Sequence, residues 1–139
     1  MEDSASAKII KDFRDLRVWQ AGMDLVIHVY RLAQAFPKHE LYGLTSQIRR
    51  AAVSVPCNIA EGHTREHTRE FLNHLSIAQG SLAELQTEFY IAERLGYLSA
   101  AQLRGILDEA ISLAKQIYAL GNAIAGSLTP NPCPPSPDE

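Results

Sequence analysis

Residues 44–62 read LTSQIRRAAVSVPCNIAEG, and this stretch decides the fold. Its apolar residues recur every three or four positions, which is the spacing of one helix face: Leu44, Ile48, Ala51, Val55 and Ile59. Pro56 stands inside this pattern, where a proline removes one backbone hydrogen bond and costs roughly 3 kcal/mol. We therefore expect a helix that forms because other helices pack against it.

A second apolar group lies on another side of the same helix and consists of Val53, Pro56 and Ala60. A helix that is apolar on two sides needs two partners. The second side is either a contact with another copy of the chain, which makes it our candidate oligomer face, or it is covered within the monomer. The residues alone leave both alternatives open.

A narrow polar strip also runs along this helix. Its members are Gln47, Arg50, Ser54, Asn58 and Glu61. Such a set can be mistaken for a binding site, but it also suits hydrogen bonds between neighbouring helices. We interpret it as an inter-helix polar strip that fixes the register of packing.

Three further stretches carry the same periodicity. In the first of them, the expected core seam is Leu16, Trp19, Met23, Val26, Tyr30 and Ala33. Alternating steps of three and four residues predict near-antiparallel helix packing at about 20°. The sequence thus indicates an all-α bundle with helices at about 15–35, 43–61, 65–95 and 99–125.

Local signals set the expected helix ends. Asp15 is the expected N-cap of the first helix, and Thr64 that of the third. Ser99 and Gln102 form a capping-box pattern at the start of the fourth. Gly80 lowers the helix propensity of the third helix, and we expect it to mark a close approach between helices.

Length and composition fit one domain of 139 residues, 46% of them hydrophobic. We divide the chain into a partly flexible N-terminal arm (1–14), the bundle (15–127) and a proline-rich tail (128–139) that its composition predicts to be disordered. Neither a signal-peptide core nor a membrane span is visible, so we expect a cytoplasmic protein without a membrane partner.

The sequence offers little for catalysis. His63, His67 and His74 share a helix face, and with nearby glutamates a zinc site is conceivable, but solvated histidines are the favoured interpretation. Cys57 has no histidine base held against it by sequence, and we expect a structural thiol. We expect no cofactor and no enzymatic activity, and a metal-dependent enzyme is a remote alternative.

Basic residues gather near helix ends, although 13 Lys and Arg against 16 Asp and Glu give a net charge of −3. That balance argues against non-specific nucleic-acid binding by a monomer. In a symmetric ring, however, even a small cluster becomes a continuous positive surface. The alternative is solvated helix ends with acidic neighbours.

Four segments together resemble one known family. They are residues 15–20 (DLRVWQ), 42–56 (YGLTSQIRRAAVSVP), 58–62 (NIAEG) and 78–84 (AQGSLAE). The chain from Phe13 to Ile124 is similar to the four-helix bundle family named after the 23S rRNA intervening sequence. Two positions depart from the family pattern: Cys57 replaces a frequent alanine, and Gln79 replaces a frequent arginine and removes its positive charge.

The resemblance implies an antiparallel up-down-up-down four-helix bundle and, for some members, a closed ring of five subunits. The chain is also similar to the accessory bundle protein of diversity-generating retroelements, a ring whose implied partners are nucleic acid and a reverse transcriptase. By that analogy the candidate nucleic-acid surface is Arg49, Arg50, Arg65 and Arg69. We therefore expect a homo-oligomeric, pentameric binding or assembly protein, with an RNA- or DNA-binding accessory factor as the alternative.

Overall fold

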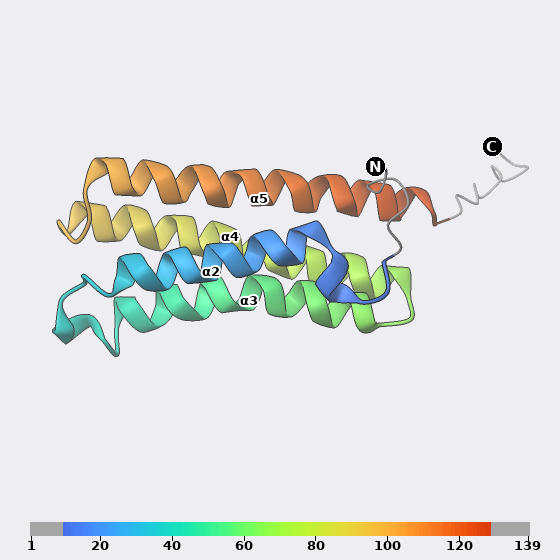
Figure 1. Cartoon of the computed structure of the whole chain (residues 1–139), viewed down its shortest axis with the longest axis horizontal. Helices are drawn as coiled ribbons and strands as arrows, with labels where there is room; N and C mark the ends of the chain where they lie inside the picture. Colours follow the sequence, from blue (N-terminus) through green and yellow to red (C-terminus); the bar gives the residue numbers. More distant parts are fainter. Residues whose placement is uncertain (1–9, 129–139) are drawn as a thin grey trace, which may run out of the picture.

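The computed structural model describes residues 10–128, and four long helices make up most of them (Figure 1). These are α2 (Arg17–Ala33), α3 (Leu44–Thr64), α4 (Thr68–Arg94) and α5 (Ala100–Gly126). Two short 3-10 helices, η1 (Phe13–Asp15) and η2 (Lys38–Glu40), precede α2 and α3. Residues 10–128 contain no strand, so the expected all-helical bundle is confirmed.

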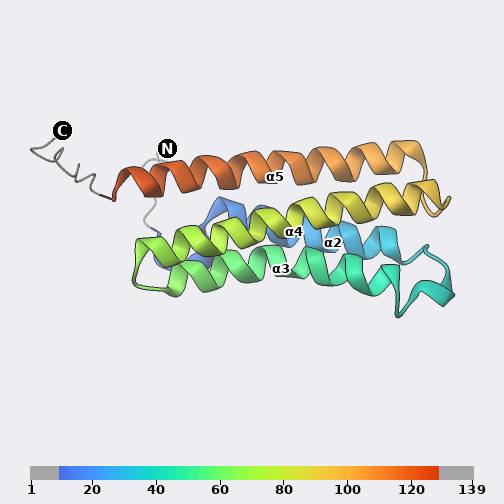
Figure 2. The same ribbon diagram turned by 180° about the vertical axis from the view of Figure 1, so that it is seen from behind.

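The helices pack in the order α2, α3, α4, α5, and α5 closes the bundle against α2. Figures 1 and 2 show from opposite sides that consecutive helices run in opposite directions and that α5 and α3 lie at opposite edges of the bundle. The largest fully buried side chains come from all four helices and include Leu25, Ile48, Ile59, Leu82, Phe89 and Ile117. The predicted core face of α3 is buried at Ile48, Ala51, Val55 and Ile59.

The predicted core seam of α2 was wrong in its rotation. The buried residues are Val18, Gly22, Leu25, Val29 and Ala33, of which the predicted seam held Ala33 alone. Met23 and Tyr30 lie exposed instead. Because α2 is apolar around most of its circumference, helical periodicity is compatible with two different core faces. Packing selects the one containing Gly22, where an added Cβ would lie 3.4 Å from the Cβ of Pro56.

Two of the expected caps were also wrong. Asp15 ends η1, and the N-cap of α2 is Leu16, which makes no side-chain cap bond. Thr64 is the last residue of α3, and α4 begins at Thr68. The capping box of α5 is confirmed, because the Ser99 hydroxyl accepts a hydrogen bond from the backbone N–H of Gln102 at 3.0 Å.

The close approach between helices lies at Gly62, and the expected one at Gly80 is not found. An added Cβ on Gly80 meets no atom of residues 10–128 within 4 Å, so Gly80 does not mark a helix contact there. An added Cβ on Gly62 would lie 2.7 Å from the Cβ of His74 and 3.0 Å from Cδ1 of Phe71. The last turn of α3 therefore approaches α4 closely because residue 62 has no side chain.

The ends of the chain are only partly described. Residues 1–9 of the expected arm and 129–139 of the expected tail lie outside the described residues. Within the arm, Asp12 caps η1 and pairs with Arg14 at 2.7 Å. No helix within residues 10–128 has the length and apolarity needed to cross a membrane.

Candidate functional site

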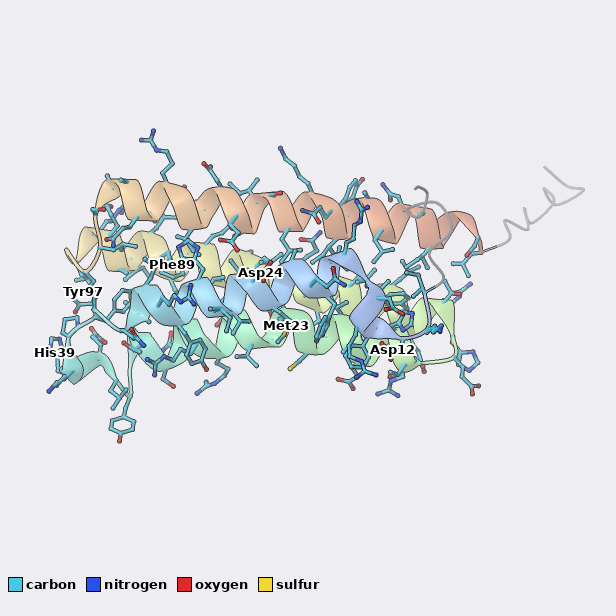
Figure 3. The ribbon with its side chains drawn as sticks, in the orientation of Figure 1. Asp12, Met23, Asp24, His39, Phe89 and Tyr97 are labelled. Carbon is cyan, nitrogen blue, oxygen red and sulfur yellow. The ribbon has the colours of Figure 1, made fainter. Side chains whose placement is uncertain are left out.

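An apolar hollow runs between α2 and α3, which we call the α2/α3 groove. It has a volume of about 370 Å³ and is lined by Phe13, Trp19, Met23, Val26, Val53, Pro56, Cys57 and Ala60. Figure 3 shows Met23 on this side of the bundle. Met23 is 39% exposed and Val53 is 36% exposed, so the groove carries apolar side chains that α2 and α3 do not cover.

The three residues of the candidate oligomer face all line this groove but differ in burial. Pro56 is buried within the chain, next to Gly22 of α2. Ala60 is half-buried, and Val53 is exposed. Packing within the monomer thus explains the burial of Pro56, but it does not cover Val53.

A second hollow lies where α2 ends and α3 begins, and we call it the arginine–tyrosine groove. It has a volume of about 610 Å³ and is lined by Tyr30, Leu41, Tyr42, Ser46, Arg49, Arg50, Val53 and Ser54. The guanidinium carbon of Arg49 lies 4.9 Å from the centre of the Tyr30 ring, a cation–π contact. Tyr42, in the turn before α3, is 93% exposed.

Sequence reasoning selected the two arginines of this groove and missed its tyrosines. Tyr30 belongs to the expected core seam of the first helix, and Tyr42 has no predicted role. The contact between Tyr30 and Arg49 depends on how α2 packs on α3, and no local pattern in the sequence indicates it.

Three members of the polar strip contact α4. The hydroxyl groups of Ser54 and Ser81 lie 2.7 Å apart, and Asn58 Oδ1 lies 3.0 Å from His74 Nδ1. Glu61 Oε2 is 3.9 Å from His74 Nε2. The other two members, Gln47 and Arg50, are exposed.

The four candidate arginines fall into two separate pairs. Arg49 and Arg50 lie in the second turn of α3, whereas Arg65 caps its C-terminal end and Arg69 lies in the first turn of α4. Arg65 is already paired with Glu61 at 2.9 Å. One chain therefore presents these arginines at opposite ends of α3 and does not bring them together.

A buried carboxyl group on α4 was not anticipated. Glu88 is 5% exposed, and its Oε1 has no hydrogen-bond partner among residues 10–128. Burial raises the pKa of Glu88 to about 7, the neighbouring Glu84 carboxylate adds to the rise, and Arg50 opposes it. The two acids are four residues apart, so they face the same side of α4.

We expect Glu88→Gln to stabilise the protein at pH 8. A carboxyl whose pKa is raised on folding stabilises the native state fully below its unfolded value, near 4.5, and loses that contribution as pH rises through about 7. The amide cannot ionise, so the free energy of unfolding of the variant should exceed that of the parent by about 1 kcal/mol at pH 8 and by much less at pH 5. Urea unfolding at both pH values measures this, and an equal change at the two would contradict it.

The three histidines considered for zinc do not meet. His63 packs edge-on against Phe71 at 5.6 Å, His74 is bonded to Asn58, and His67 is exposed. No group of three or more potential ligands is close enough to hold a metal ion within the described part of the chain. Cys57 is a free, exposed thiol in the α2/α3 groove.

The chain matches a known family and a solved structure. The model of the family described as 23S rRNA-intervening sequence protein matches residues 14–119. The fold is similar to the crystal structure of a protein of unknown function from the S23 ribosomal protein family of Bacteroides thetaiotaomicron, with a TM-score of 0.70. The two chains are 19% identical over 75% of this chain and 97% of the other. No curated protein matches the sequence.

Proposed function

Since the chain belongs to the 23S rRNA-intervening sequence protein family, we propose that it is a non-enzymatic, cytoplasmic homo-oligomer that serves as a binding and assembly module. The resemblance to ring-forming members suggests five subunits. The observation that carries this proposal is the α2/α3 groove, whose apolar residues Met23 and Val53 remain exposed in the single chain. Contiguous apolar surface of this kind is typical of protein contacts.

A closed ring also requires a second, different contact surface on each chain, because rings of more than two copies join unlike faces. The bundle offers one between α4 and α5, away from the α2/α3 groove. There a hollow of about 290 Å³ includes Leu72, Ile117 and Tyr118, and Tyr118 is 67% exposed. Two apolar faces on opposite sides suit head-to-tail assembly.

Light scattering at micromolar concentration tests the proposal. We expect a mass that is a multiple of 15.4 kDa, and five times this value if the ring resembles the known ones. A monomer at this concentration would overturn the proposed function.

A second candidate function is nucleic-acid binding as an accessory factor, in line with the resemblance to the retroelement bundle protein. It is favoured by one observation: within residues 10–128, neither Arg49 nor Arg50 forms an ion pair, while both line a hollow of about 610 Å³. Unneutralised arginines are the groups that bind phosphate.

We expect labelled RNA to bind the assembled protein with an affinity that falls steeply as salt rises, because bound phosphates release counterions. Fluorescence anisotropy over a range of about 50–200 mM salt measures this. Binding that does not change with salt, or no binding at the lowest salt, would exclude the second candidate and leave the assembly module intact.

A further inference from the structure

We propose that the arginine–tyrosine groove is a binding site for single-stranded nucleic acid, with an unpaired base stacked on Tyr42 and a backbone phosphate held by Arg49 and Arg50. This inference rests on the second candidate function and gives it a location and a substrate class. The site combines Tyr30 and Tyr42 with the candidate arginines Arg49 and Arg50.

Arg49 is held in place before any ligand arrives. Its guanidinium lies over the Tyr30 ring at 4.9 Å, and its Nε is buried without a hydrogen-bond partner. The planar guanidinium fork suits phosphate oxygens, and a fork that is already oriented loses less freedom on binding. The buried Nε is out of reach of a ligand, so the stacking on Tyr30 fixes the side chain and a phosphate would be bound by its terminal nitrogens.

Tyr42 supplies the aromatic surface. At 93% exposure it makes almost no contact with the rest of the chain, yet it borders the same hollow as the two arginines. An exposed aromatic ring beside a positive groove is the arrangement by which proteins stack successive bases of single strands. Paired bases in a duplex are already stacked on one another, so this ring favours unpaired ones.

The hollow has room and polarity for one nucleotide unit. Its volume of about 610 Å³ lies within the range of small-ligand sites. Among residues 10–128, the Ser46 hydroxyl accepts one side-chain hydrogen bond, from Arg50 at 3.4 Å, so it can also donate to a phosphate oxygen. Arg50 lies near the acids of α4, where its charge lowers the pKa of Glu88. Arg49 should therefore contribute more than Arg50 to phosphate binding.

The other arginine pair makes a natural control. Arg65 is paired with Glu61 at 2.9 Å, Arg69 lies in the first turn of α4, and neither lines the arginine–tyrosine groove. The structure therefore predicts unequal roles for arginines that the sequence alone treats alike.

The test uses full-length protein and a fluorescent oligouridylate of about eight nucleotides in anisotropy titrations. We expect Tyr42→Ala and Arg49→Gln each to weaken binding about tenfold, and Arg49→Gln also to lower the magnitude of the salt slope by about 0.7, the loss of one single-strand phosphate contact. The matched controls are Tyr90→Ala, an exposed tyrosine on α4 that lines neither groove, and Arg69→Gln. Both controls should stay within twofold of the parent.

Each other outcome overturns the proposal. A hairpin duplex that binds as tightly as the single strand excludes base stacking, and a polyglutamate peptide that competes equally makes the groove a general acid-binding surface. Loss of binding in Arg69→Gln but not in Tyr42→Ala moves the site to the other end of α3 and leaves the second candidate standing. Light scattering on the same samples reports separately on assembly, and circular dichroism confirms that each variant is helical.

Discussion

The double substitution Met23→Glu with Val53→Glu should convert the assembled protein into a folded monomer. Both side chains are more than one-third exposed in the single chain, so glutamates there remain solvated after the bundle folds. In an interface they would place two unpaired charges in an apolar contact, which is strongly unfavourable. Size-exclusion chromatography with light scattering should give a mass near 15.4 kDa.

Ile27→Glu is the matched control for this experiment. Ile27 also lies on α2 and is 47% exposed, but it lines neither the α2/α3 groove nor the arginine–tyrosine groove. The control should keep the parent mass. A double variant that assembles like the parent would show that the α2/α3 groove is not the contact, even if the protein is an oligomer.

How far the sequence predicts the fold depends on how many apolar stripes each helix has. In α4 the apolar residues at seven-residue spacing, Leu75, Leu82 and Phe89, are all buried, so the periodicity of this helix indicates its core face. In α2 two apolar stripes could each form the core face. The choice between them depends on the close packing of Gly22 against Pro56, which helical periodicity does not predict. The predicted α2 seam failed for this reason.

In the candidate site, too, the sequence predicts which residues share a helix face but does not predict contacts between helices. The wheel of α3 placed Ser54 and Asn58 on one strip, and both make side-chain bonds to α4 residues. Contacts between residues distant in sequence could not be read from a wheel: the approach of Arg49 to Tyr30 and the burial of Glu88 each require a neighbouring helix in a known register.

Helix ends were the least predictable part, and the reason is visible at Gly62. A glycine followed by eight polar residues is typical of a turn, yet α3 continues through it to Thr64. The absence of a Cβ allows α4 to pack against this last turn. A glycine before polar residues is typical of a turn, but Gly62 instead allows close contact between α3 and α4.

We therefore expect Gly62→Ala to destabilise the protein although alanine is the better helix former. The new methyl group would lie 2.7 Å from the Cβ of His74, an atom fixed to the backbone of α4, so the helices must separate. Overpacking of this kind costs about 1–3 kcal/mol. It should exceed the gain in helix propensity of about 1 kcal/mol and lower the melting temperature by several degrees.

Gly80→Ala gives the same chemical change without the contact. An added Cβ at residue 80 meets nothing within 4 Å, so only the propensity gain remains, and this variant should melt at a higher temperature than the parent. Thermal unfolding followed by circular dichroism compares the two. Opposite signs for one substitution at two helical glycines would establish that α3 and α4 meet at Gly62, whereas stabilisation by both would show that the helices are farther apart there.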